Sequence, residues 1–251
     1  MPTDLRFYLF AIPAVILVGL AKGGFTGLGA LGTPLIALGI DPIRGAAILL
    51  PILIAQDAVG VYAFRRSWDG RILAIMLPGA VAGVVIGYVF AASVPEKAVM
   101  AVLGAISILF GAYRLWVERG HRIAASSHSP AWVGSLFGIA TGFTSQIAHA
   151  GGPPFQMWVM PRRLPRDTFV GTSAIFFAAL NWIKVPAYVA LGQFDRANLT
   201  TSLALLPLAI VASLAGVKLV RHVPVERFYT IVYLLMIAAG LKLLLDGLGV
   251  A

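Results

Sequence analysis

Two lysines lie inside long apolar stretches of this chain, and both stand near groups that can bind an anion. Lys22 directly precedes a glycine-rich break. Asn181 and Lys184 are three residues apart, so their side chains share one helical face. A charge at the centre of a bilayer costs about 2.5–3.5 kcal/mol, which makes such residues candidates for function. Lysine charge combined with hydroxyl, amide and backbone N–H donors is the chemistry that binds oxyanions.

Glycines interrupt two apolar stretches at corresponding places in the two halves of the chain. The first cluster has five glycines in the ten residues 23–32, followed by Thr33; the second has Gly142, Gly151 and Gly152, followed by two prolines. Glycine lets a ligand approach the main chain, and proline suits the first turn of a helix. Each cluster therefore predicts the start of a short helix whose free N–H groups attract anions. Two such ends would form one central site, as in secondary transporters. The alternative is that the glycines only allow helices to pack closely.

The predicted substrate-binding residues are the two lysines together with polar, glycine and aromatic residues at or near the breaks. They are Lys22, Gly23, Gly24, Thr26, Gly32, Thr33, Gln56, Thr144, Ser145, Gln146, His149, Gly151, Gly152, Asn181, Trp182 and Lys184. For His149, hydrogen bonding at the cavity is favoured over proton relay. Asp57 is the one acid deep within a segment, which makes it a candidate proton carrier; a structural ion pair with Lys22 or Lys184 is the alternative. No cluster of histidines and carboxylates stands near these residues, so neither a metal site nor a cofactor is predicted.

The composition places these residues in a membrane. The 251 residues are 59% hydrophobic and 12% charged, whereas about a quarter of the residues of a soluble domain are charged. Apolar runs such as 72–92, 99–116 and 199–220 are long enough to cross a bilayer core of about 30 Å. The first run, 7–21, is expected to be part of the mature structure, because its repeat partner lies in mid-chain at 132–150. The sequence therefore predicts an all-α polytopic membrane protein.

The two halves align beyond the glycine clusters; Gly45 matches Gly171, and Gly111 matches Gly240. Each half predicts a short pair of segments broken by glycines, followed by three full spans. The segments lie near 7–21, 29–40, 45–64, 72–92 and 98–116 in the first half and near 131–148, 153–160, 168–191, 199–220 and 227–248 in the second. Residues 29–40 reach only about 18 Å as a helix, so the short pairs predict half-helices or re-entrant hairpins. The predicted organisation is one integral membrane domain with repeat 1 at 1–120, a cytoplasmic linker at 121–130 and repeat 2 at 131–251.

The loop charges predict how the halves are inserted. With ten segments and alternating sides, one side holds twelve cations: Arg65, Arg66, Arg71, Arg114, Arg119, Arg122, Arg162, Arg163, Arg166, Lys218, Arg221 and Arg227. The other side holds four: Arg6, Arg44, Lys97 and Arg196. This bias places the richer side in the cytoplasm and both termini outside it. Equivalent loops of the two halves carry opposite bias, which favours inverted repeats; if each broken pair were a single crossing, the repeats would be parallel. The net charge of +9 thus belongs to membrane loops, and no nucleic-acid partner is expected.

The motifs at 19–34 and 138–153, each rich in glycine and each opening one half, resemble those of the sulfite exporter TauE/SafE family of bacterial membrane transporters. The resemblance covers nearly the whole chain. It implies transport of sulfur-containing or related organic anions, such as sulfite, sulfonates or thiosulfate, across the plasma membrane. The chain departs from the family's run of three consecutive glycines, because it has Ala30-Leu31-Gly32 in the first motif and Ala150-Gly151-Gly152 in the second.

The expected function is therefore a secondary transporter that moves a small organic or sulfur-containing anion by alternating access of the two halves. No nucleotide-binding P-loop motif occurs, so the driving force is expected to be the membrane potential or a gradient of protons or another ion. The alternatives are a membrane-embedded enzyme and a non-transporting partner subunit of a membrane complex. An enzyme is not expected, because the segments offer no nucleophile–base pair and no metal cluster. A subunit that only supports a complex has no need for paired polar breaks.

Overall fold

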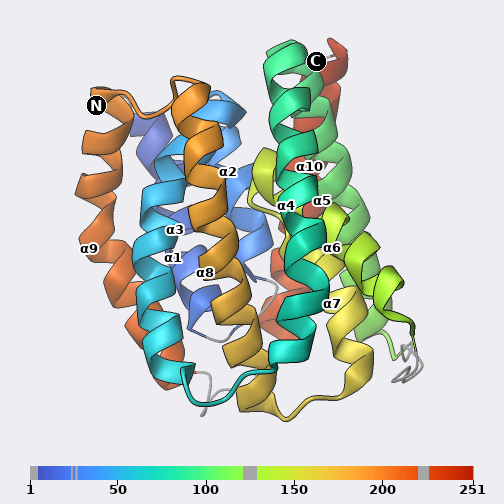
Figure 1. Cartoon of the computed structure of the whole chain (residues 1–251). Helices are drawn as coiled ribbons and strands as arrows, with labels where there is room; N and C mark the ends of the chain where they lie inside the picture. Colours follow the sequence, from blue (N-terminus) through green and yellow to red (C-terminus); the bar gives the residue numbers. More distant parts are fainter. Residues whose placement is uncertain (1–4, 24, 26–27, 121–128, 220–225, 251) are drawn as a thin grey trace.

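The computed structural model describes residues 5–23, 25, 28–120, 129–219 and 226–250, and in these residues it contains helices and no strands (Figure 1). The helices are α1 (Leu5–Lys22), α2 (Gly32–Ala37), α3 (Pro42–Phe64), α4 (Gly70–Ser93), α5 (Glu96–Glu118), α6 (Ala131–Ala148), α7 (Gly152–Val159), α8 (Arg166–Ala190), α9 (Arg196–Leu219) and α10 (Glu226–Leu248), with the 3₁₀ helices η1 (Leu28–Leu31) and η2 (Met160–Arg162). Residues 121–128 of the predicted linker, and with them Arg122, lie outside the described residues, as does Arg221.

Seven of the described helices are long and apolar enough to cross a membrane by their length and composition, namely α1, α3, α4, α5, α8, α9 and α10. Their outer faces carry large apolar side chains: Val85, Leu109, Leu203 and Val211 are each more than half exposed. A surface of this kind suits contact with lipid rather than water. The prediction of an all-α polytopic membrane protein is confirmed.

Both glycine breaks fold as antiparallel hairpins. After α1 the chain turns back through η1 and α2, so that Gly29 lies against Ala21 and Gly39 lies against Phe10. After α6 the chain turns back through α7, and the Nη2 atom of Arg162 donates to Ser129 Oγ at 2.9 Å. Each hairpin therefore begins and ends at the same end of the bundle. The short segments predict either half-helices or re-entrant hairpins. In the structure they form hairpins.

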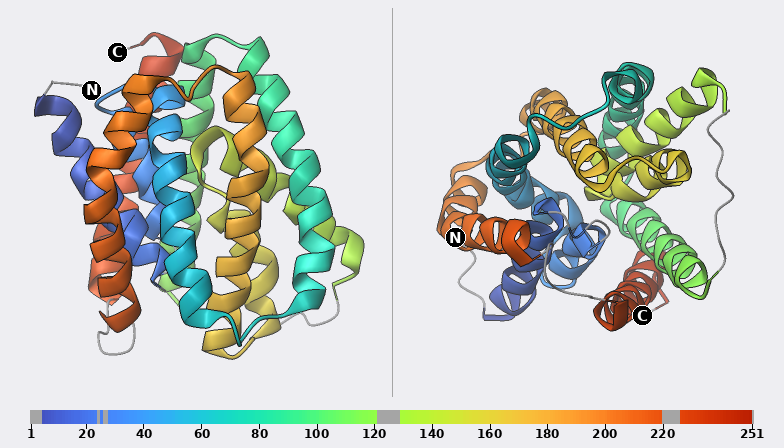
Figure 2. Two further views of the ribbon diagram at one scale, coloured as in Figure 1. Left: turned by 60° about the vertical axis from the view of Figure 1, so that its left-hand side comes forward. Right: turned by 90° about the horizontal axis from the view of Figure 1, so that it is seen from below.

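The packing of the helices is symmetrical between the halves. Helix α4 packs along α6, and the corresponding helix α9 packs along α1; α3 packs on α8, and α5 packs on α10 (Figure 2). Corresponding helices run in opposite directions along the bundle, and the start of α1 and the end of α10 lie at the same end (Figure 1). An exchange of the two halves therefore reproduces these four pairings.

The seam between α4 and α6 depends on glycine. A Cβ atom added to Gly83 would collide with the carbonyl oxygen of Ile139, and one added to Gly142 would collide with that of Ala80. These carbonyls belong to helix backbone, so neither can move without shifting a whole helix. Small residues that let two backbones approach closely are the usual way in which membrane helices pack.

We expect Gly83→Ala and Gly142→Ala each to destabilise the protein by about 1–3 kcal/mol, because the extra methyl group forces α4 and α6 apart. The measurement is the melting temperature of the purified protein in detergent. Gly70→Ala is the matched control, since its Cβ would first meet the ring of the half-exposed Trp68, at 3.2 Å. Equal melting temperatures for all three variants would show that the seam tolerates a wider spacing.

Candidate functional site

A cavity of about 100 Å³ lies where the two hairpin breaks meet. Gly29 and Thr33 line it from the first break, and Gly152 and Pro153 line it from the second. Side chains from α1, α3, α5, α6 and α8 complete its wall. The starts of α2 and α7 therefore face one common space, at the place where the glycine clusters predict a central site.

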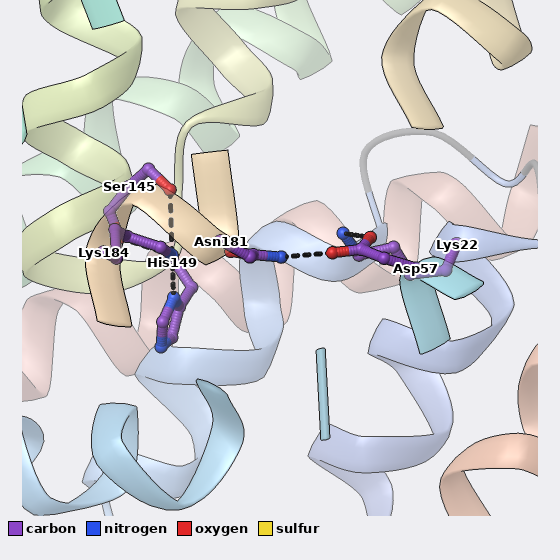
Figure 3. Close-up of polar contacts among 6 residues, drawn as sticks. All are labelled: Lys22, Asp57, Ser145, His149, Asn181 and Lys184. Carbon is purple, nitrogen blue, oxygen red and sulfur yellow. Dashed lines mark hydrogen bonds and ion pairs between the residues drawn. The ribbon is translucent and has the colours of Figure 1, made fainter. Parts of the chain in front are cut away.

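One wall of the cavity carries an ion pair. Lys22, at the end of α1, pairs through Nζ with Asp57 Oδ1 of α3, and Asn181 Nδ2 of α8 donates to Asp57 Oδ2 at 2.6 Å (Figure 3). Lys22 Nζ also lies 5.5 Å from the centre of the Phe177 ring. Lys22 and Asn181 line the cavity, whereas Asp57 is 3% exposed and lies behind them. The charge of Lys22 is thus balanced by Asp57, which is the structural pairing foreseen as the alternative for both residues.

Lys184 of α8 forms a second polar group at the cavity. Its side chain is fully buried, and Nζ lies 2.6 Å from His149 Nδ1, 3.1 Å from Ser145 Oγ and 3.3 Å from the Ser145 carbonyl oxygen (Figure 3). Three acceptors match the three N–H donors of a lysine ammonium group. No carboxylate contacts Lys184 in the part of the chain that the structure describes. Ser145 and His149 line the cavity, so this buried cation stands directly behind the cavity wall.

Hydrogen bonds determine the proton position on His149. Its Nε2 atom lies 2.8 Å from the carbonyl oxygen of Ala46, which can only accept, so Nε2 carries the hydrogen. Nδ1 is then the acceptor for Lys184 Nζ. The imidazole is therefore neutral in this arrangement. It lies between Lys184 and the cavity and adds no charge of its own.

The end of α6 aims His149 at this position. His149 is the C-cap of α6 and has a left-handed backbone conformation with φ 49°, while the N–H of Ala150 bonds to the carbonyl of Thr144 at 3.2 Å. Glycine usually occupies such a position, and another residue there needs support from its surroundings. The bonds of the ring to Ala46 and Lys184, and the nearly parallel ring of Tyr188 at 6.0 Å, provide that support.

Six of the predicted binding residues line the cavity. They are Lys22, Thr33, Ser145, His149, Gly152 and Asn181. Lys184 stands behind two of them, as described above. Gly24 and Thr26 lie outside the described residues.

Two predicted binding glycines serve packing between helices. A Cβ atom on Gly32 would collide with the side chain of Val18 within the first hairpin, and one on Gly23 would lie 2.5 Å from the backbone of Gly216 in α9. Both therefore have the packing role that was the alternative for the glycine clusters. Gly152 differs, because the nearest atom to its Cβ position is 3.7 Å away.

The remaining predicted residues do not line the cavity. Gln56 donates to a carbonyl of α9 at 3.2 Å, Thr144 bonds within its own helix at 2.8 Å, and Gln146 packs against α4. Gly151 lies in the turn between α6 and α7 against Ser145 and Thr141. Trp182 is 63% exposed and faces outward.

Sequence reasoning missed Gln156 and Arg114. Gln156 lies in α7, is the one glutamine in that helix, and lines the cavity. Polar residues within apolar segments are candidates for function, and this signal could have identified Gln156 as well. The comparison of charges on the two sides includes Arg114, but this residue lies within α5 and is only 9% exposed, so it belongs to the interior of the bundle. Among the described residues no group of three or more histidines and carboxylates could hold a metal ion.

Comparisons with known proteins agree with this architecture. Residues 11–243 match the family model described as sulfite exporter TauE/SafE. Over 238 residues the chain is 25% identical to the probable inner membrane transporter protein TsaS of Comamonas testosteroni, and the alignment covers 89% of this chain and 95% of that protein. No solved structure matches the chain significantly. Because the family match spans nearly the whole length, the chain belongs to the sulfite exporter TauE/SafE family, and it is a membrane transporter rather than an enzyme.

Proposed function

We propose that the protein is a secondary transporter that moves a small organic or sulfur-containing anion, of the sulfite, sulfonate or thiosulfate class, across the plasma membrane. The observation that carries this proposal is the charge balance around the cavity. Lys22 and Asp57 cancel each other, whereas Lys184 has no carboxylate partner in the described part of the chain. An unpaired buried charge is costly, and a bound anion would offset that cost.

Neutral donors around the cavity complete an oxyanion site. The Thr33 hydroxyl is buried and lines the cavity, and it has no hydrogen-bond partner among the described residues. Ser145 and Asn181 add a hydroxyl and an amide at the same cavity. Hydrogen bonds from several such donors to anionic oxygens are stronger than bonds between neutral groups. The donors are therefore available for an anion beside the buried cation.

The relation between the halves supports a mechanism of alternating access. The opposite directions of corresponding helices and their exchangeable contacts support inverted repeats that rock around a central site. The cavity reaches Val170 near the start of α8, whereas at the other end of α8 the Tyr188 hydroxyl donates to the Gln146 carbonyl at 2.9 Å. This difference fits a state that is open towards the end carrying Arg65 and Arg66. The charge bias of the loops favours the cytoplasm on that side and both termini on the other.

Asp57 is the candidate for the residue that binds and releases the proton if a proton gradient drives transport. It bonds to one cation and one amide at the cavity wall, so a change in its charge alters the position and charge of Lys22 directly. Ionisable residues inside the membrane form the proton relays of many transporters. We therefore propose proton coupling through Asp57.

Transport into proteoliposomes tests the proposed function. Purified protein should give saturable uptake of at least one of sulfite, thiosulfate and a short alkyl sulfonate, and the other two should compete with it. Protein-free liposomes are the control for leakage. Absence of saturable flux for all three anions, from protein that is monodisperse and melts cooperatively, would contradict the proposal.

A further inference from the structure

Arg114 is a second buried cation beside the cavity, on α5. Its Nε atom donates to the Tyr233 hydroxyl at 3.0 Å, and its Nη1 atom donates to Gln156 Oε1 at 3.1 Å. The guanidinium group lies 5.2 Å from the centre of the Tyr233 ring. All these partners are neutral, and no carboxylate pairs with Arg114 among the residues that the structure describes. Like Lys184, it is a buried cation whose hydrogen-bond partners among the described residues are all neutral groups.

The bond from Arg114 fixes the direction in which the Gln156 amide faces. An arginine can only donate, so the atom that it contacts must be the amide oxygen. The amide nitrogen Nε2 therefore occupies the other side, and it is the nearest atom to the Cβ position of Gly152, at 3.7 Å. Both Gly152 and Gln156 line the cavity. Nε2 donates to no acceptor in the described part of the chain, although Gln156 is only 4% exposed.

We propose that Gln156 binds the transported anion through Nε2, and that Arg114 positions this amide and supplies a second positive charge to the site. This inference rests on the proposed function, because it assumes that the cavity holds an anion. A charged donor on Oε1 polarises the amide and strengthens the bonds that its N–H groups make. Gln156 thereby becomes a better donor to an anionic oxygen than an isolated glutamine.

The two sides of the cavity then follow one pattern. On α6, Ser145 and His149 face the cavity with Lys184 behind them; on α7, Gln156 faces it with Arg114 behind it. On these two sides neutral groups contact the substrate, and the buried cations Lys184 and Arg114 supply positive charge from behind them. A site of this kind attracts an anion without holding it in a direct ion pair, and a transported ion must also be able to leave its site.

Lys184 and Arg114, which have no carboxylate partner among the described residues, also predict which anions bind best. Two positive charges are balanced by an anion with two negative charges, so thiosulfate should bind more tightly than the singly charged methanesulfonate. Removal of the charge of Arg114 should lower the affinity for thiosulfate more than the affinity for methanesulfonate. A purely structural role for Arg114 would change both affinities by the same factor.

Isothermal titration of the purified full-length protein with thiosulfate and with methanesulfonate tests the inference. For Gln156→Leu we expect the Kd of both anions to rise about 10-fold or more, because a donor to a charged oxygen is lost. For Arg114→Gln we expect a similar rise for thiosulfate and a smaller one for methanesulfonate. Gln193→Leu and Arg65→Gln are the matched controls, since both lie outside the cavity, and their Kd values should equal those of the wild type.

The outcomes separate this inference from the proposed function. If the folded wild-type protein binds neither anion, the proposed function fails, and the inference fails with it. If the wild type binds and Gln156→Leu binds equally well, only the role of Gln156 is overturned. If Gln156→Leu does not fold, Gln156→Met keeps the length and packing of the side chain without the amide, and unchanged Kd values for that variant would overturn the inference. A uniform loss for both anions in Arg114→Gln would overturn the role of Arg114 in charge selection.

Discussion

Replacement of Lys184 by methionine is expected to raise the Kd for the transported anion by about 10- to 100-fold. Lys184 provides a positive charge directly behind Ser145 and His149, the groups that line the cavity. At an effective dielectric constant of about 20, opposite charges about 6–8 Å apart attract each other by roughly 2–3 kcal/mol, and each 1.4 kcal/mol is a factor of about ten in Kd. Titration of the purified variant with thiosulfate measures the effect.

The same variant is expected to remain folded. Lys184 is fully buried, and methionine has a similar length without a charge, so the substitution removes an unbalanced charge from the interior. Replacement of buried ionic groups by apolar residues of similar volume is often neutral or stabilising. The melting temperature without ligand should therefore stay close to that of the wild type, while the same anion concentration should raise it less than in the wild type.

Lys242→Met is the matched control for this experiment. Lys242 lies on α10, is about half exposed, and pairs with Asp246 one helical turn later at 2.8 Å. An exposed pair of this kind contributes little to stability, and it lies outside the cavity. The control should keep both the wild-type affinity and the wild-type melting temperature. Equal affinities for Lys184→Met and the wild type would remove Lys184 from the site.

The long helices could be predicted from the sequence because their limits are marked locally. The predicted segment 72–92 corresponds to α4 (Gly70–Ser93), which begins where the Asp69 carboxylate accepts from the backbone N–H groups of Arg71 and Ile72. The predicted segment 45–64 corresponds to α3 (Pro42–Phe64), which begins at a proline after the capping residue Asp41. Apolar length together with such caps is sufficient to place a spanning helix.

Which side chains face the cavity could be predicted only in part. Neighbouring residues on a helix differ in direction by about 100°, and the direction of the cavity is not encoded next to them. Asn181 therefore lines the cavity while Trp182 faces outward, and Asp57 meets Lys22 while Gln56 faces α9. A rule based on depth in the membrane selects both members of each pair. The packing of distant helices decides between them.

The same limit explains Arg114. In the sequence, an arginine close to the end of an apolar segment cannot be distinguished from an arginine in the adjoining loop. Both are counted together when the charges on the two sides of the membrane are compared. Its burial depends on Gln156 and Tyr233. These residues are 42 and 119 positions away along the chain, and both lie in the second half. Only the assembled helices show that this cation belongs to the interior.

Asp57→Asn is expected to separate anion binding from proton coupling. Asparagine has the shape of aspartate and can still accept from Lys22, but it cannot bind and release a proton in this range of pH. The substitution also leaves Lys22 without a balancing charge, so the affinity for the anion should be equal to that of the wild type or higher. In proteoliposomes, exchange of external for internal anion should persist, whereas accumulation driven by a pH gradient should be lost.

Asp246→Asn is the control for Asp57→Asn, because Asp246 also pairs with a lysine but lies at the end of α10 outside the cavity. It should retain both exchange and gradient-driven accumulation. If Asp57 only holds Lys22 and Asn181 in place, Asp57→Asn should instead reduce exchange and accumulation by the same factor, together with the melting temperature. A selective loss of accumulation is the result that only a proton carrier explains, since exchange needs an intact site but no net movement of protons.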